Sequence, residues 1–117
     1  VYGQAGQVDE AWKYFEEMIA VGHKPNTVTF NIMLRSFGKR GTIDKVKELW
    51  KRMRAEGVDP DVLTYTTLID AHGSRGDLAS ALKFLGQMLE DGLKPDAITY
   101  TNLMMLFFAN FGYQFVC

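Results

Sequence analysis

The nine-residue stretch GVDPDVLTY at residues 57–65 occurs in related form twice more in the chain. It reads GHKPNTVTF at residues 22–30 and GLKPDAITY at residues 92–100, so glycine, proline, threonine and an aromatic residue each recur every 35 residues. Met18, Met53 and Met88 keep the same interval. An interval of this length, kept by several residue types at once, is typical of a repeat architecture in which each unit stacks on its neighbours.

Each unit predicts two helices. After each proline, apolar residues fall at offsets 0, 3, 4 and 7, which is the spacing of one helix face. A second stripe with the same offsets follows Gly41 and Gly76, and the glycine and proline at each unit boundary are expected to end the helix. The first-helix stripes are Phe30, Met33, Leu34 and Phe37; Tyr65, Leu68, Ile69 and His72; and Tyr100, Leu103, Met104 and Phe107. The second-helix stripes are Ala11, Tyr14, Phe15 and Met18; Val46, Leu49, Trp50 and Met53; and Ala81, Phe84, Leu85 and Met88.

The fold class that follows is all-α, a right-handed α-solenoid of stacked antiparallel helix pairs. We predict about six helices, at about 8–20, 28–39, 43–55, 63–73, 78–90 and 98–109, and no strand. Residues 1–26 form a partial first repeat that supplies a second helix, residues 27–61 and 62–96 form complete repeats, and residues 97–117 form a partial repeat with a divergent hydrophobic tail. We expect the chain to be a fragment of a longer array, with a tail whose exposed apolar surface favours self-association.

Composition and charge restrict the function. Of 117 residues, 13 are Lys or Arg and 14 are Asp or Glu, which gives a net charge of −1. Any attraction for nucleic acid must therefore be local to a groove. The longest apolar run is too short to span a membrane, so we expect no membrane partner. No carboxylate pair, nucleophile–base set, phosphate loop or metal-ligand spacing recurs with the repeat, so we expect no enzymatic activity, metal or cofactor.

The units resemble the pentatricopeptide repeat. The resemblance rests on the period, on the Thr–aromatic pairs at 29–30, 64–65 and 99–100, and on the unit ends Lys24-Pro25-Asn26, Asp59-Pro60-Asp61 and Lys94-Pro95-Asp96. It covers the chain from Val1 to about Phe107 and implies sequence-selective binding of single-stranded RNA, one base per repeat. It also implies a role in RNA processing, stability or translation in a mitochondrion or chloroplast.

Two polar positions and one apolar position in each unit are candidates for RNA contacts. A polar side chain can hydrogen-bond a base edge, and an apolar one can press on a base face. The polar residue after the Thr–aromatic pair is turned about 100° from the core face. The apolar candidates are Val28, Leu63 and Ile98; the polar candidates are Asn31, Thr66 and Thr101 on the helix, and Asn26, Asp61 and Asp96 after the proline.

The alternative for the residues after the proline is helix capping, since Asn and Asp are common N-caps. The resemblance instead implies that the two polar positions act as a pair across the unit boundary. Asn31 with Asp61 resembles the pair that prefers uracil, and Thr66 with Asp96 resembles the pair that prefers guanine. Asn26 and Thr101 lack partners in this chain. The implied RNA text is U then G, from 5′ to 3′.

The remaining polar residues have simpler interpretations. Lys39 is similarly placed to family lysines that reach a phosphate, although the equivalent positions hold Ser74 and Gln4, so the positive track is discontinuous. His72 falls on a core stripe and is expected to be packed. The charge runs are interpreted as the solvated outer face of second helices; they are Lys45, Lys47 and Glu48, and Lys51 and Arg52. The competing function is a helical-repeat scaffold for protein partners of the full-length array, which would present an apolar or charged groove.

Overall fold

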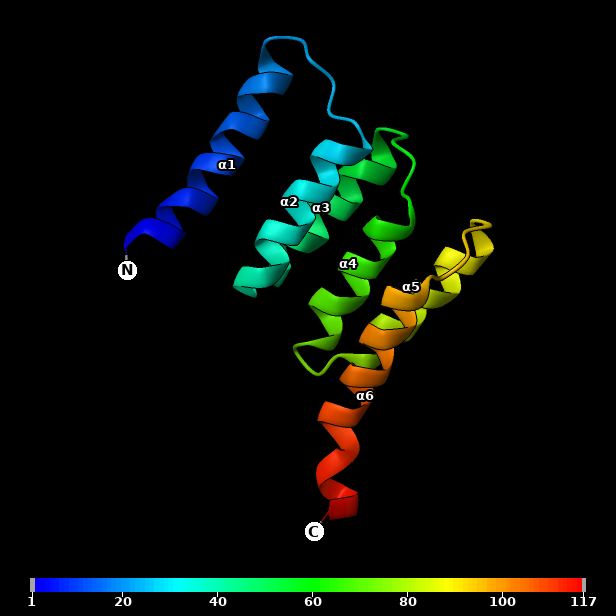
Figure 1. Cartoon of the computed structure of the whole chain (residues 1–117). Helices are drawn as coiled ribbons and strands as arrows, with labels where there is room; N and C mark the ends of the chain where they lie inside the picture. The colour runs from blue at the N-terminus through cyan, green and yellow to red at the C-terminus, as the bar shows by residue number, and fades with distance from the viewer. Residues whose placement is uncertain (1, 117) are drawn as a thin grey trace. The chain divides into compact units, whose positions relative to one another are not determined.

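The computed structural model describes the backbone of residues 2–116 and the side chains of residues 10–110. Within these residues the chain contains six α-helices and no strand, as predicted (Figure 1). The helices are α1 (Tyr2–Ala20), α2 (Thr27–Arg40), α3 (Ile43–Ala55), α4 (Val62–Gly73), α5 (Leu78–Glu90) and α6 (Ala97–Val116).

Two helix boundaries differ from the prediction by more than one residue. The first helix starts at Tyr2 and not near residue 8, and the last continues to Val116 and not to about residue 109. Gly6 lies inside α1, which is possible because a single glycine costs a helix only about 1 kcal/mol relative to alanine. The side chains of the aromatic tail beyond residue 110 lie outside the described residues.

The turns that end the second helices share one hydrogen-bond pattern. The glycine takes a left-handed conformation, with φ of 70° at Gly57 and 82° at Gly92, where a side chain would be strained. The next residue donates its backbone N–H to the carbonyl of the recurring methionine five residues earlier, as in a Schellman cap. These bonds are His23 to Met18 at 2.9 Å, Val58 to Met53 at 3.1 Å and Leu93 to Met88 at 3.1 Å.

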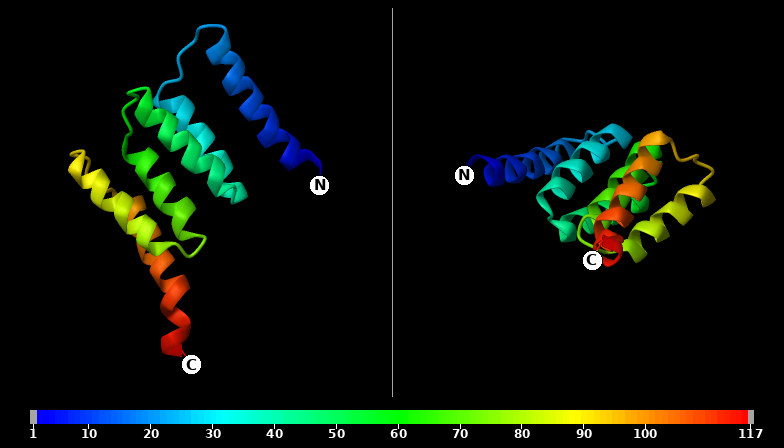
Figure 2. Two further views of the ribbon diagram at one scale, coloured as in Figure 1. Left: turned by 180° about the vertical axis from the view of Figure 1, so that it is seen from behind. Right: turned by 60° about the horizontal axis from the view of Figure 1, so that its bottom comes forward.

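The chain forms two compact units, Val1–Asp59 and Pro60–Cys117, and each is described by itself. In the first unit α2 and α3 lie side by side in opposite directions, and α1 packs on α2 (Figures 1 and 2). Aromatic pairs join α1 to α2 in this unit. The Trp12 ring lies 5.4 Å from Phe37, and the Phe15 ring lies 5.5 Å from Phe30. Trp12 was missing from the predicted stripe, whereas Tyr14, which was on it, is exposed.

Two charged residues of α3 contact α1 in the first unit. The solvated interpretation agrees with the exposure of Lys47, Glu48 and Lys51, whereas Lys45 and Arg52 are partly covered by aromatic rings. The Lys45 ammonium lies 4.3 Å from the centre of the Trp12 ring. The Arg52 guanidinium lies 5.0 Å from the Phe15 ring and forms an ion pair with Glu16 at 3.1 Å. Long basic side chains can cover apolar surface while their charged ends find water or a carboxylate, and here the aromatic rings of α1 provide that surface.

In the second unit α4 packs against both α5 and α6. The buried cluster joins all three helices and consists of Ile69, Ala81, Leu103 and Leu106, with Leu78, Phe84, Leu85 and Phe107 packed against it. The Tyr65 hydroxyl donates to the Asp91 carboxylate at the end of α5. His72 is buried as predicted, with its ring 5.2 Å from Phe84 and its Nδ1 3.8 Å from the Asp77 carboxylate.

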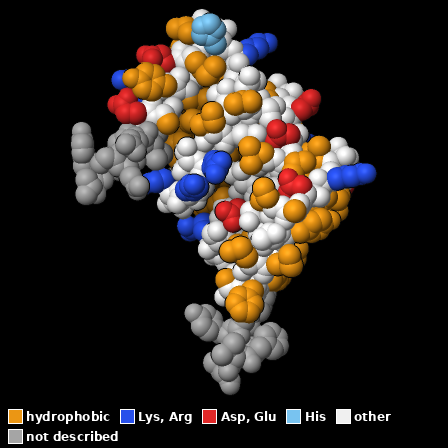
Figure 3. Space-filling view, viewed as in Figure 1, with side chains coloured by type: hydrophobic (Ala, Val, Ile, Leu, Met, Phe, Trp, Pro, Cys, Tyr) orange, Lys and Arg blue, Asp and Glu red, His pale blue; other side chains and the backbone are white. Residues whose placement is uncertain are grey.

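One side of α6 is uncovered. Tyr100 and Met104 lie at the positions of buried Tyr65 and Ile69, yet both are exposed, together with Met105 and Phe108. Figure 3 shows hydrophobic side chains gathered over α6. The exposure follows from the absence, within the described residues, of a helix that covers this side of α6 as α5 covers α4. Self-association through this surface stays a prediction.

Candidate nucleic-acid interface

The three apolar candidates all reach solvent from the first turn of a first helix. Val28 on α2 is 63% exposed, Leu63 on α4 is 48% exposed and Ile98 on α6 is 64% exposed. The same repeat position therefore carries an exposed branched aliphatic side chain in all three units. Single exposed apolar residues are ordinary. Their recurrence at one position beside polar groups is what a surface for stacking against flat ligands requires.

The polar residues on the helices are less accessible than expected. Asn31 and Thr66 are each only 6% exposed, whereas Thr101 is exposed. The cause at Thr66 is α6, whose Thr99 lies against it with its hydroxyl oxygen 2.7 Å from that of Thr66. Any ligand must therefore approach Thr66 through a small opening.

The residues after the prolines cap the helices that follow. Asn26 Oδ1 accepts from the backbone N–H of Thr29 at 3.0 Å, and Asp61 Oδ1 accepts from that of Thr64 at 3.0 Å. Asp96 Oδ1 accepts from the backbone N–H of Thr99 at 2.9 Å. The capping alternative thus holds at all three positions. Each capping side chain is also exposed, so capping leaves it within reach of a ligand.

Asp96 is kept ionised by its cap. The backbone N–H of Thr99 and then the Thr99 hydroxyl, at 2.8 Å, hold the pKa of Asp96 below its ordinary value. Both of these hydrogen bonds end on Oδ1. An ionised carboxylate has no proton to donate, so at neutral pH Asp96 can only accept hydrogen bonds.

Thr99 connects the two candidates of the second unit. Its hydroxyl contacts both Thr66 Oγ1 and Asp96 Oδ1, and its side chain is fully buried. Sequence reasoning missed this role, although the recurrence of Thr29, Thr64 and Thr99 was a visible signal. The candidates of the other pair lie in different units, with Asn31 in the first and Asp61 in the second.

Cations lie near the ends of first helices. Lys39 is exposed in the last turn of α2, next to Arg40. Arg75 is exposed in the turn after α4. An exposed ammonium group has little desolvation to overcome before it meets a phosphate, so these positions suit contacts with a nucleic-acid backbone.

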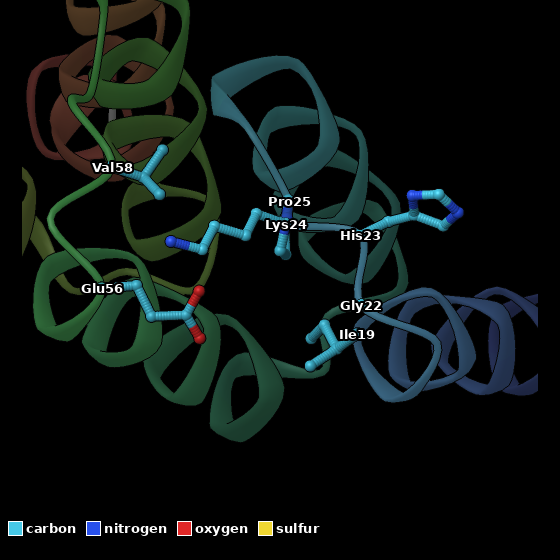
Figure 4. A pocket seen from close by; sticks show the side chains of 7 residues that line it. All are labelled: Ile19, Gly22, His23, Lys24, Pro25, Glu56 and Val58. Carbon is cyan, nitrogen blue, oxygen red and sulfur yellow. The ribbon is translucent and has the colours of Figure 1, made fainter.

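The first unit also has an open pocket of about 490 Å³ where the loop after α1 approaches the end of α3. Lys24 and Glu56 extend into it, and His23 points away (Figure 4). The opposite charges of Lys24 and Glu56 leave this pocket without a marked preference for an anion. Ile19, Pro25 and Val58 make up its apolar part.

Among the residues the structure describes, no group of three His, Cys, Asp or Glu residues could hold a metal ion. In the same part of the chain, no helix combines the length and apolar character needed to cross a bilayer.

Comparisons with known proteins agree with the repeat. A model of the PPR repeat family matches residues 1–39, 25–74 and 60–107. The crystal structure of the pentatricopeptide repeat protein PPR10 from maize is 26% identical, with a TM-score of 0.76 over 96% of this chain and 16% of that one. The structure of PPR10 in complex with an 18-nucleotide psaJ RNA element is 33% identical, with a TM-score of 0.78 over 88% of this chain and 15% of that one.

A third solved structure is more distant. The PPR domain of Arabidopsis thaliana protein-only RNase P 1, in complex with tRNA, is 20% identical, with a TM-score of 0.74 over 92% of this chain and 55% of that one. Its likeness shows the fold alone. No curated protein matches the chain. The chain spans only a small part of the maize protein and about half of the Arabidopsis domain.

Proposed function

The chain belongs to the pentatricopeptide repeat family, and we propose that it binds single-stranded RNA, one base per repeat. In this proposal residues 27–61 and 62–96 are complete repeats, flanked by partial repeats at 1–26 and 97–117. The chain contributes binding, and no catalytic role is assigned to it. The RNA bound by PPR10 supports the choice of ligand.

The observation that carries the proposal is the exposure of Val28, Leu63 and Ile98 at one repeat position. A base between two such side chains would bury apolar area on both of its faces, and a stacked base contributes on the order of 1–3 kcal/mol. This contact tolerates every base. The neighbouring polar groups must therefore supply the selectivity.

For the selective contacts we propose Asn31 with Asp61 for uracil and Thr66 with Asp96 for guanine. Uracil offers one N3–H donor between two carbonyls, which suits a carboxylate beside an amide that can donate. Guanine offers the N1–H and N2–H donors side by side, which suits two acceptors. Asn26 and Thr101 would read bases together with partners in neighbouring repeats, and Lys39 would contact a phosphate. The biological role would be organelle RNA processing, stability or translation in a mitochondrion or chloroplast.

The test is Thr66→Asn in a longer array that contains these two repeats. We expect the base preferred opposite the second repeat to move from guanine toward uracil, because the asparagine amide can donate to a uracil carbonyl. The measurement is the affinity for RNAs that differ only at that base. Thr67→Asn is the matched control, because it makes the same change on the next, half-buried residue of α4 and should leave the preference unchanged.

Because Thr66 is buried, each variant must first be shown to be folded by circular dichroism and its melting curve. A folded Thr66→Asn array with the original base preference would contradict the base-reading proposal and favour the protein-scaffold function. The isolated chain should bind RNA only weakly, because two complete repeats provide few base contacts against the cost of ordering both partners.

A further inference from the structure

The hydroxyl groups of Thr66 and Thr99 form a chain that ends on a negative charge. The Thr66 Oγ1 lies 2.8 Å from the carbonyl oxygen of Val62 and 2.7 Å from Thr99 Oγ1. The Thr99 Oγ1 lies 2.8 Å from Asp96 Oδ1. All four residues belong to the second unit. Three oxygen–oxygen contacts thus join four groups at hydrogen-bond distance.

The protons of this chain can be counted. Each threonine hydroxyl carries one proton, and the carbonyl and the ionised carboxylate carry none. Two protons therefore serve three contacts. The Thr66 proton points either to Thr99 or to the Val62 carbonyl, and both lie inside the protein. In either state Thr66 can meet a further partner only with a lone pair.

The negative charge favours one direction of the chain. When Thr66 donates to Thr99 and Thr99 donates to Asp96, both protons point toward the carboxylate. Hydrogen bonds to an ionised acceptor are roughly twice as strong as neutral ones, and bonds in series polarise one another. In this direction the Thr66 proton stays inside the protein, and the Thr99 hydroxyl joins Thr66 to Asp96.

We propose that Thr99 is a positioning residue whose hydroxyl links Thr66 to Asp96, fixes the spacing of these two acceptors and so determines that this repeat prefers guanine. The inference rests on the proposed function and adds a third residue to the pair that reads the base. Thr66 and Asp96 together present two acceptors. Guanine alone offers two adjacent donors, because adenine and cytosine each place an amino donor next to a ring-nitrogen acceptor and uracil has one donor between two carbonyls.

The experiment uses the longer array with Thr99→Val, which keeps the shape of the side chain and removes the hydroxyl. We expect the preference for guanine over adenine opposite the second repeat to fall about tenfold, because Thr66 and Asp96 lose the hydroxyl that holds the two acceptors at one spacing. Thr99→Ser keeps the hydroxyl and should retain the preference. Thr29→Val is the matched control, because it removes the equivalent capping hydroxyl of α2 and should leave the second repeat's preference unchanged.

A second readout separates positioning from a loss of packing. NMR titration of the Asp96 carboxyl in the array should show its pKa rise toward the ordinary value in Thr99→Val and stay low in Thr99→Ser. A purely structural role for Thr99 would give weaker binding to all four bases with their ranking unchanged. If Thr99→Val does not fold, Thr99→Ala removes the hydroxyl without adding volume and carries the same expectation.

The outcomes are distinct. A folded Thr99→Val or Thr99→Ala array that keeps its guanine preference overturns the inference, as does a folded Thr99→Ser array that loses it. If Thr66→Asn shifts the preference while Thr99→Val does not, the proposed function survives and only the role of Thr99 fails. If the unaltered array discriminates no base at this repeat, the proposed function fails first.

Discussion

At the scale of single residues, Tyr65 ties the start of α4 to the end of α5 through its hydrogen bond to Asp91. The bond crosses from a fully buried ring to an exposed carboxylate, and hydrogen bonds to charged groups contribute about 1.5–3 kcal/mol. Tyr65→Phe should therefore lower the free energy of unfolding by about 1–2 kcal/mol, as measured by urea denaturation. Tyr100→Phe is the matched control at the same repeat position, where the ring is 53% exposed, and should change stability by less than about 0.5 kcal/mol. Equal losses in the two variants would mean that the Asp91 bond does not stabilise the unit.

The burial of Thr66 shows what single-residue reasoning could predict from the sequence. Helical periodicity predicts that Thr66 points about 100° away from Tyr65 around the helix axis. It could not show that α6 lies over the neighbouring face and brings Thr99 to within 2.7 Å. Periodicity describes a helix about its own axis, whereas burial depends on which second and third helices pack against it. The N-caps at Asn26, Asp61 and Asp96 were easier to predict from the sequence, because each depends only on a contact with the residue three positions later.

At the scale of helices, α4 and α6 approach closely at Gly73. A Cβ at this position would lie 2.3 Å from Leu106 Cδ1 and 3.1 Å from Leu106 Cγ, so the buried leucine would have to move. Overpacking of this kind costs about 1–3 kcal/mol. It outweighs the helix propensity that alanine gains, about 1 kcal/mol at most. We expect Gly73→Ala to lower the free energy of unfolding.

Gly86→Ala is the matched control for this contact. Gly86 lies inside α5, and a Cβ there meets nothing within 4 Å, so alanine should stabilise the unit by about 0.5–1 kcal/mol. Adding Leu106→Ala to Gly73→Ala should cost less than Leu106→Ala alone, because in that background it also removes the clash with the new Cβ. If both glycine variants gain stability in urea denaturation, α4 and α6 do not pack as closely as the structure indicates.

The helices themselves were largely predictable because 35-residue periodicity fixes glycine, proline and apolar residues together. Four of the six helices lie within one residue of the predicted bounds at both ends. The pairing of α1 with α3 was not predictable, because it depends on Lys45 and Arg52 covering aromatic rings. Charged residues at helical spacing give no sign of whether they face solvent or a ring on another element.

At the scale of the whole molecule, a binding surface must act without a net positive charge. The 13 basic and 14 acidic side chains nearly cancel, so attraction for RNA depends on where individual cations lie. The repeat frame could predict which positions recur but not which cations stay available. Lys39 remains exposed, whereas Lys45 and Arg52 are engaged by α1. The same residue type thus has different roles in first and second helices.

Lys39→Gln tests whether this cation contacts the RNA backbone. Binding to single strands weakens with salt in proportion to the phosphates neutralised, and each contributes about 0.7 to the slope of log K against log salt concentration. In the longer array, Lys39→Gln should therefore reduce the slope by about 0.7 and weaken binding equally for all four bases. Lys51→Gln makes the same change at an exposed position of α3 and should leave the slope unaltered.

The measurement is fluorescence anisotropy of labelled RNA between about 50 and 200 mM salt, the range over which such binding falls steeply. If the two variants reduce the slope equally, RNA responds to overall charge and not to a track along the first helices. If neither does, the bases and apolar side chains carry the binding without Lys39.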